Sequence, residues 1–327
     1  MPGPRNRRAR VTAVQLKTLI VILLAAAAAC GPPASGASPD AASAPAARPL
    51  KTFVAILPQA YFVERIGGPY VEVHVLVGPG QSPHTFDPTP QQMARLAGAR
   101  IFFAVGLPFE RQLLAKAKAV NPNLHVIDTR EGIPPRYMTP AEAEADERAE
   151  RAAGAPAGHA DAGEPDPHFW LNPRYARTQA ATIAKALAAA DPAHAEAFRK
   201  NLAALEEDLG KLDTRLREAL APLAGRDFFV YHPAFGYFAD AYGLRQIPVE
   251  IEGKEPTARQ LAGLIGRARA EGVRVIFVQP QFSAKSAEAV AQAIGGSVIP
   301  MDDLAKDYLA NMTDMAEKVR KALGVTR

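Results

Sequence analysis

Short apolar runs alternate with longer amphipathic stretches from residue 50 onward, and this pattern predicts alternating strands and helices. In the first half of this region, the expected strands are 51–57, 71–77, 101–105 and 125–128. The expected helices are 61–66, 90–97 and 110–120. A repeat of this kind implies a mostly parallel sheet covered by helices.

A second group of elements follows the same pattern towards the C-terminus. Its expected strands are 227–231, 246–250, 273–278 and 297–300. Its expected helices are 235–242, 257–271, 283–294 and 308–323. We therefore expect a second parallel sheet with its own helices.

Between the two groups lies a helical region, 173–220, which is interrupted at Asp191-Pro192. The predicted fold is α/β with two lobes, each a mostly parallel sheet flanked by helices, joined by a long connecting helix. We place the N-terminal lobe at 50–171, the connecting helix at 172–192 and the C-terminal lobe at 193–327.

The N-terminus has the pattern of an export signal. Five basic residues precede or border an apolar run at 18–29 that is shorter than the ~20 residues of a membrane span. We expect a signal peptide at 1–29, followed by Cys30 in a sequence that resembles a bacterial lipobox. The alternative is an ordinary cleaved signal that leaves a free thiol. Residues 30–49 are rich in Ala, Pro and Ser, which predicts a flexible linker.

Cysteine content and charge narrow the possible functions. With Cys30 as its single cysteine, the chain cannot form an internal disulfide or a thiolate zinc cluster. The first 29 residues hold five of the 38 basic residues and none of the 34 acidic ones, so the remainder carries 33 basic residues against 34 acidic. This near-neutral balance argues against nucleic acid as a partner.

Four residues in Pro- or Asp-rich turns are candidate metal ligands: His84, His168, His232 and Asp302. Three of them follow expected strands, whereas His168 precedes the central helical region. Ligands of open α/β sheets bind beyond the C-terminal ends of strands, so we expect a metal site in the interlobe cleft. Three imidazoles and one carboxylate complete the coordination of Zn(II).

Several sequence segments resemble the metal-specific solute-binding proteins of bacterial ABC importers, of the ZnuA and TroA type. They are GPGQSPHTFDPTPQQ, DPHFWLNP, HPAFGYFADAYGL, VEIEGKEPTARQL, IFVQPQFSAKSAEAVA and MDDLAKDYL. The resemblance extends from residue 53 to the C-terminus. The chain departs from the family pattern at Pro233 and at Gln279, where Glu is frequent.

The resemblance implies capture of Zn(II) or Mn(II) and delivery to an ABC transporter permease with a cytoplasmic ATPase. The three histidines match the family's histidine ligands, and Asp302 matches its variable carboxylate position. We expect a monomer, exported to the periplasm or the outer face of the cytoplasmic membrane and anchored there through lipid at Cys30.

Ligand chemistry favours zinc over manganese or iron as the cargo, because imidazole nitrogen suits Zn(II) whereas Mn(II) prefers oxygen. The segment 139–165 is acidic and contains one histidine, His159. We interpret it as a solvated charged loop, with weak collection of cations as the alternative.

Two other classes of function fit a three-histidine site. A secreted zinc hydrolase has three protein ligands and an open water position, but this chain has no HExxH motif, and Asp302 would fill that position. A binding protein for a metal chelate or an organic solute is the other alternative, since the two-lobed fold alone does not determine the ligand.

Overall fold

The computed structural model describes residues 48–139, 142, 165–249, 265–266, 268–270, 274–282 and 285–324. The chain divides into two compact units, Met1–Ala46 and Ala47–Arg327, and all the described residues belong to the second. Within these described ranges, none of the helices combines the length and apolar character needed to cross a membrane. The predicted signal peptide and Cys30 lie outside the described residues.

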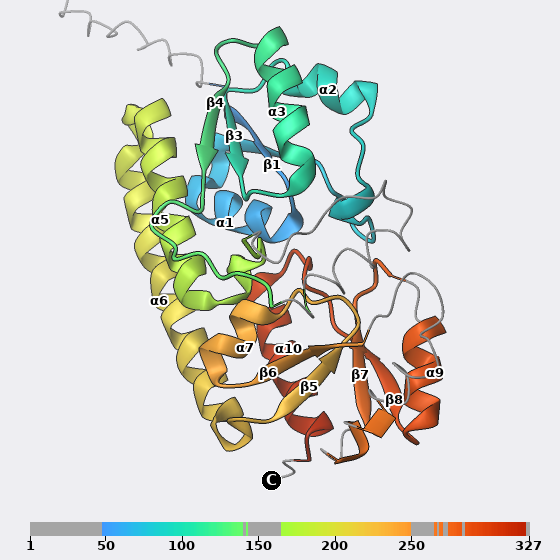
Figure 1. Ribbon diagram of the computed structural model, residues 1–327. Coiled ribbons are helices and arrows are strands. Elements are labelled where there is room, and N and C mark those ends of the chain that lie inside the picture. Colours follow the sequence, from blue (N-terminus) through green and yellow to red (C-terminus); the bar gives the residue numbers. More distant parts are fainter. Residues whose placement is uncertain are drawn as a thin grey trace, which may run out of the picture. The chain divides into compact units, whose positions relative to one another are not determined.

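The first sheet consists of four parallel strands in the order β2-β1-β3-β4 (Figure 1). The strands are β1 Leu50–Val54, β2 Val71–Val75, β3 Ile101–Ala104 and β4 His125–Asp128. The helices that connect them are α1 Leu57–Gly67, α2 Pro90–Leu96 and α3 Pro108–Val120. Alternate residues of the central strands enter two cores, one of which contains buried residues of α3 and the other those of α1.

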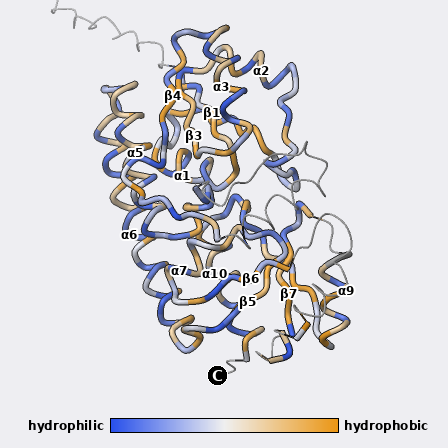
Figure 2. Tube along the Cα trace, viewed as in Figure 1, coloured by the Kyte–Doolittle hydropathy of each residue, from blue (hydrophilic) through white to orange (hydrophobic). Residues whose placement is uncertain are grey.

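The second sheet has the same construction, with four parallel strands in the order β6-β5-β7-β8. The strands are β5 Asp227–Val230, β6 Arg245–Pro248, β7 Val275–Val278 and β8 Ser297–Pro300. The helices around them are α7 Gly236–Tyr242, α9 Lys285–Ala293 and α10 Tyr308–Ala322. Figure 2 shows hydrophobic positions along the inner strands, where apolar side chains face helices on both sides.

A helical hairpin of α5 Pro173–Ala190 and α6 Ala195–Leu220 runs beside both sheets (Figure 1). The buried residues of α6 follow helical spacing: Phe198, Leu205, Leu209, Leu212, Leu216 and Leu220. At ~1.5 Å per residue, α6 is long enough to pack against α1 in the first lobe and α10 in the second. One continuous hydrophobic core therefore extends through both lobes.

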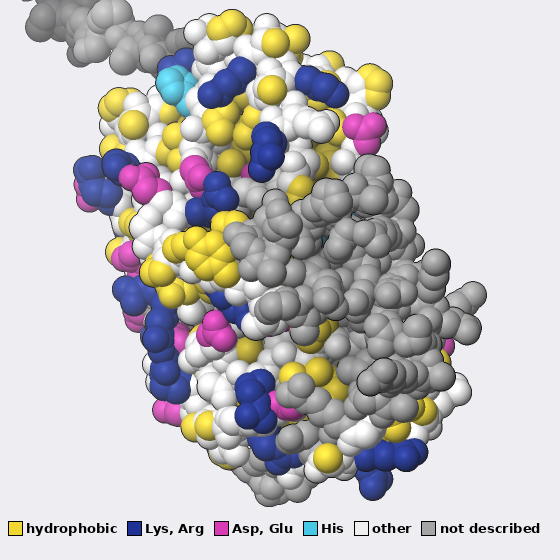
Figure 3. Space-filling model, in the orientation of Figure 1, with side chains coloured by type: hydrophobic (Ala, Val, Ile, Leu, Met, Phe, Trp, Pro, Cys, Tyr) yellow, Lys and Arg dark blue, Asp and Glu magenta, His cyan; other side chains and the backbone are white. Residues whose placement is uncertain are grey.

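The outer surface of this hairpin carries interspersed basic and acidic side chains, visible along the left edge of Figure 3. Asp213 bonds Arg174 across the two helices and Arg217 one turn further along α6. Such exposed pairs add little stability, typically ~0.2 to 1 kcal/mol each. The buried face of α6 therefore carries most of its stabilisation.

The two-lobed α/β fold with a long connecting helix is confirmed, and β4 and β8 have the predicted bounds. The first strand ends at Val54 rather than at residue 57 because α1 already begins at Leu57, with Pro58 in its first turn. Helix α6 packs against α1 in the first lobe and against α10 in the second. It lies beside α5, which occupies the 172–192 segment predicted as the connecting helix. The lobe boundaries stay a prediction, since 47–327 form one compact unit. The expected helix 257–271 and the loop 139–165 lie mostly outside the described residues.

Candidate metal centre

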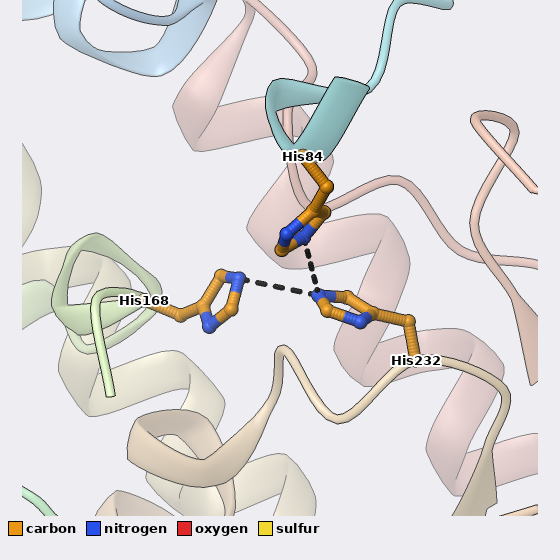
Figure 4. A group of neighbouring side chains, drawn as sticks. All are labelled: His84, His168 and His232. Carbon is orange, nitrogen blue, oxygen red and sulfur yellow. Dashed lines mark hydrogen bonds between the residues drawn. The ribbon is translucent and has the colours of Figure 1, made fainter. Parts of the chain in front are cut away.

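Three histidines from distant parts of the sequence meet between the two sheets (Figure 4). His84 lies in a single 3-10 turn, Pro83–Thr85, after β2. His168 directly precedes another such turn, Phe169–Leu171, and His232 follows β5. One ring nitrogen from each histidine lies within 4.8 Å of the others. The structure thus brings together all three histidines that the sequence singled out.

Two of the separations between the histidine ring nitrogens match the distance between neighbouring ligands of a tetrahedral ion. The Nε2 atom of His232 lies 3.3 Å from Nε2 of His84 and 3.4 Å from Nε2 of His168. Two nitrogen ligands, each ~2.05 Å from one tetrahedral zinc ion, lie about 3.3 Å apart. Two of the three separations therefore match tetrahedral zinc coordination, and the third pair of ring nitrogens lies within 4.8 Å.

His168 is held in one orientation and one tautomer by Asp166. The Asp166 carboxylate, which is fully buried, accepts from the His168 main-chain N–H at 2.9 Å and lies 2.8 Å from Nδ1. A carboxylate accepts hydrogen bonds, so the proton of a neutral His168 ring resides on Nδ1. The lone pair of Nε2 is then directed at the other two histidines, as metal binding demands.

His232 is buried and held in its neutral form. Burial, together with the nearby rings of His84 and His168, lowers its pKa well below 6.5. Its main chain is fixed by Gln279, which accepts from the His232 N–H at 3.3 Å and donates to the His232 carbonyl at 2.8 Å. The ring stacks on Phe282 with 4.9 Å between centroids. Neutral imidazole is the form that binds a metal.

His84 is the most accessible of the three and comes from a constrained loop. The Ser82 hydroxyl accepts the His84 main-chain N–H at 3.2 Å, and Pro83 fixes the start of the turn. The cavity among the histidines is also lined by Leu107, Trp170 and Phe282 and has a volume of about 10 Å³. This is room for about one water-sized guest, a size that suits a bare ion.

The structure does not bring Asp302 to the histidine group. Its Oδ1 accepts from Gln281 Nε2 at 3.0 Å and from the Leu304 N–H at 2.9 Å. The adjacent Asp303 lines the cavity instead and is 5% exposed. No donor among the described residues reaches Asp303 Oδ1, and burial raises its pKa to about 6 despite the opposing influence of His168 and His84. Neither carboxylate belongs to the three-histidine group, but Asp303 lines the cavity, and the assignment of Asp302 as a ligand stays a prediction.

Comparison with known families agrees with this geometry. The family described as "Zinc-uptake complex component A periplasmic" (ZnuA) matches residues 53–322. The chain belongs to the ZnuA family. Its two-lobed fold is therefore a feature shared with solved structures of ZnuA.

Relatives and solved structures extend the comparison over most of the chain. The manganese ABC transporter substrate-binding lipoprotein PsaA of Streptococcus pneumoniae is 28% identical over 290 residues, which cover 81% of this chain and 86% of that protein. The high-affinity zinc uptake system protein ZnuA of Bacillus subtilis is 27% identical and covers 78% of both chains. A crystal structure of ZnuA is 40% identical, with a TM-score of 0.74, and covers 84% of this chain and 100% of that one.

The remaining histidines of the described region do not join the group. His74 pairs with Glu72 at 3.0 Å on the edge strand, and His194 pairs with Asp191 at 2.6 Å beside α5. His125 is exposed at the start of β4. His159 lies outside the described residues, as do the glutamates at 250, 252 and 255.

Three residues that orient or line the site were not assigned these roles from the sequence: Asp166, Gln279 and Asp303. Asp166 carried a usable signal, because an acidic residue two positions before a ligand histidine can reach its Nδ1. Gln279 was noted only as a departure from the family pattern. Its contact with His232 depends on the pairing of β5 with β7, which local sequence does not reveal.

Proposed function

We propose that this protein captures Zn(II) outside the cytoplasmic membrane and delivers it to the permease of an ABC importer with a cytoplasmic ATPase. The observation that carries the proposal is the convergence of ring nitrogens of His84, His168 and His232 within 4.8 Å of one another. Membership of the ZnuA family supports the transport role.

For the fourth ligand we propose Asp303 in place of Asp302. Asp303 lines the cavity, and its Oδ1 receives no hydrogen bond from the described residues. A buried carboxylate in this condition gains a partner when a cation binds. In Asp302, by contrast, Oδ1 already accepts hydrogen bonds from Gln281 and from the Leu304 N–H.

Zinc is the proposed cargo because the site offers three imidazole nitrogens and one carboxylate. Such a set suits Zn(II), whereas Mn(II) prefers more oxygen ligands and binds more weakly in the Irving–Williams order. A structure that is 39% identical over 85% of this chain, with a TM-score of 0.75, is an internal-deletion variant of ZnuA with zinc bound. PsaA, named for manganese, is similar at 28% identity, so manganese is the competing cargo that the experiment must include.

Location follows from the same proposal. A zinc-capturing component works outside the cytoplasmic membrane, and a signal at 1–29 would export it there. Lipid on Cys30 would then keep the metal-binding lobes near the permease. A binding role rather than catalysis is supported by the buried, nearly closed cavity, because a fourth protein ligand leaves no coordinated water to activate.

The proposal is tested by competitive titration of the metal-stripped full-length chain with Zn(II) and Mn(II). We expect one tight zinc site, which is lost in His232→Ala and weakened in Asp303→Ala. Asp302→Ala serves as the matched comparison and should weaken zinc less than Asp303→Ala. A larger effect at Asp302 would return the fourth ligand to that residue. Tighter binding of manganese would change the cargo, and no tight site for either ion would refute the metal function.

A further inference from the structure

Arg136 lies 32 residues before His168 in the sequence, and its guanidinium is the centre of a buried ionic network. Its side chain is 15% exposed and contacts three carboxylates. Nη2 lies 2.7 Å from Glu142 Oε1, Nη1 lies 3.0 Å from Asp166 Oδ2, and Nε lies 3.1 Å from Asp240 Oδ2. All of its nitrogens are therefore engaged.

One branch of this network leads to His168. Asp166 uses one carboxylate oxygen for Arg136 and the other for the ring and main chain of His168. The position of the guanidinium thus determines how the carboxylate is oriented towards the imidazole. A ligand histidine held in this way is fixed in its ring rotation as well as its tautomer.

The other branch leads to the loop that carries His232. Glu142 Oε1 also accepts from Gln246 Nε2 at 2.9 Å. The Gln246 amide then donates to the Pro233 carbonyl at 3.2 Å and accepts from the Phe235 N–H at 2.6 Å. Arg136 therefore connects, through one carboxylate on each side, the segment that carries His168 and the loop that carries His232.

Gly236, in the first turn of α7, leaves space for the side chain of Arg136. A Cβ atom at Gly236 would lie 2.3 Å from the guanidinium carbon of Arg136, which is closer than any real contact. Gly236 does not have a positive φ, so the requirement for glycine here is one of space. The main-chain N–H of Arg136 also donates to the Tyr237 hydroxyl at 2.7 Å.

We propose that Arg136 is a positioning residue that sets the relative placement of His168 and His232, and that Gly236 is glycine in order to leave room for its guanidinium. This inference rests on the proposed metal function and deepens it. The network places the two ligand loops before the ion arrives, so less ordering is required on binding.

The buried ionic network is stable only when all its buried charges are paired. Burial lowers the pKa of the Arg136 guanidinium, but its hydrogen bond to Glu142 and the charges of Glu142, Asp166 and Asp240 outweigh that effect and raise it. Removing one partner of a buried ion pair leaves the other charge uncompensated. Asp240 differs from the other two because its side chain is 63% exposed, so its contact contributes little.

The test measures zinc dissociation constants by competition with a chromophoric chelator on the full-length chain. The variants are Asp166→Asn, Arg136→Gln, Gly236→Ala and the double variant Arg136→Gln with Gly236→Ala. Gly236→Ala retains every charge, so it tests whether the position of the Arg136 guanidinium affects zinc binding even if Arg136→Gln fails to fold. Asp240→Asn controls for the exposed carboxylate. Gly210→Ala controls for a glycine in a helix, because a Cβ there meets nothing within 4 Å.

We expect Asp166→Asn, Arg136→Gln and Gly236→Ala each to weaken zinc binding by ~10-fold or more. Adding Gly236→Ala to Arg136→Gln should cause no further loss, because the group that it displaces is gone. The visible spectrum of the Co(II)-substituted protein should change in the same variants, since the arrangement of the ligands changes. Both controls should stay within about twofold of wild type.

A purely structural contact would lower the melting temperature of the metal-free protein and leave the zinc dissociation constant and the Co(II) spectrum unchanged. That result in Gly236→Ala would overturn the inference, as would additive losses in the double variant. Absence of zinc binding by the wild type would instead refute the proposed function, and the inference with it.

Discussion

The Gln279 side chain brackets the main chain of His232. Its amide oxygen accepts the His232 N–H at 3.3 Å, and its amide nitrogen donates to the His232 carbonyl at 2.8 Å. Gln279 itself is fully buried at the end of β7. The strands β5 and β7 therefore support His232 through the Gln279 side chain as well as through their own hydrogen bonds.

Replacing Gln279 by Leu should destabilise the protein and weaken zinc binding. Leucine has a similar size but removes both hydrogen bonds that Gln279 makes to the main chain of His232, whereas the bond from the Ala234 N–H to the His232 carbonyl at 2.9 Å remains. We expect a loss of ~1 to 3 kcal/mol in total. Urea unfolding of the metal-free protein measures the first effect, and chelator competition measures the second. Gln292→Leu, at an exposed position on α9, is the control and should change neither quantity appreciably.

Zinc should stabilise the fold in proportion to its occupancy of the three-histidine site. A ligand that binds only the native state adds ~2.7 kcal/mol when its free concentration is 100 times its dissociation constant. We expect a corresponding rise in melting temperature for wild type under zinc-buffered conditions. His84→Ala should lose this rise, because it removes the third nitrogen, yet it should melt close to wild type without metal since His84 is half-buried. His74→Ala should keep the full rise in melting temperature with zinc. Loss of this rise in His74→Ala would contradict the assignment of the zinc site to the three histidines.

The elements of the fold could be predicted from local sequence because strand and helix signals were separated by clear breaks. The run 297–300 and the helix from Tyr308 were both found in this way. The three histidines were found because each lies in a Pro- or Asp-rich turn near an element end. The network that orients them was not, since Arg136 meets Asp166 through a bridge between Tyr137 and Pro165 and meets Asp240 from the second lobe.

The sequence alone does not show whether Asp302 or Asp303 faces the histidines. Both residues follow β8, and either could face the histidines. The turn decides between them: the Leu304 N–H bonds back to Asp302, and Trp170 donates to the Asp303 carbonyl at 2.9 Å. The side chain of Asp303 therefore points at the cavity for reasons that lie partly on another segment.

The continuous core along α6 predicts that the two lobes unfold together. Leu209 is fully buried in the middle of this helix, where truncation creates a cavity. We expect Leu209→Ala to cost ~2 to 5 kcal/mol while retaining a single transition by fluorescence and circular dichroism. The control Glu207→Ala, an exposed position paired with Lys211, should change stability by less than ~0.5 kcal/mol. Two separate transitions in wild type would show that the lobes are independent.

Glu110 gives the stability of the protein a predictable pH dependence. Its carboxylate accepts from the Val105 N–H at 3.0 Å and from the Gly106 N–H at 2.7 Å, and it is 3% exposed. Burial raises its pKa from 4.5 to about 7, although the two main-chain bonds and Arg130 act in the opposite direction. Between these two values the folded state holds a proton that the unfolded state has released.

Stability should therefore fall as pH rises from about 4.5 to about 7 and then become independent of this group, a total of about 3 kcal/mol. Glu110→Gln cannot ionise, so it should lack this contribution. The amide also has one acceptor fewer, and the variant should be less stable than wild type at the acidic end. Because every other titratable group is present in both proteins, the difference in unfolding free energy between wild type and Glu110→Gln isolates Glu110. Urea unfolding of the metal-free forms at both ends of the range should show this difference shifting in favour of glutamine, and a constant difference would contradict the prediction.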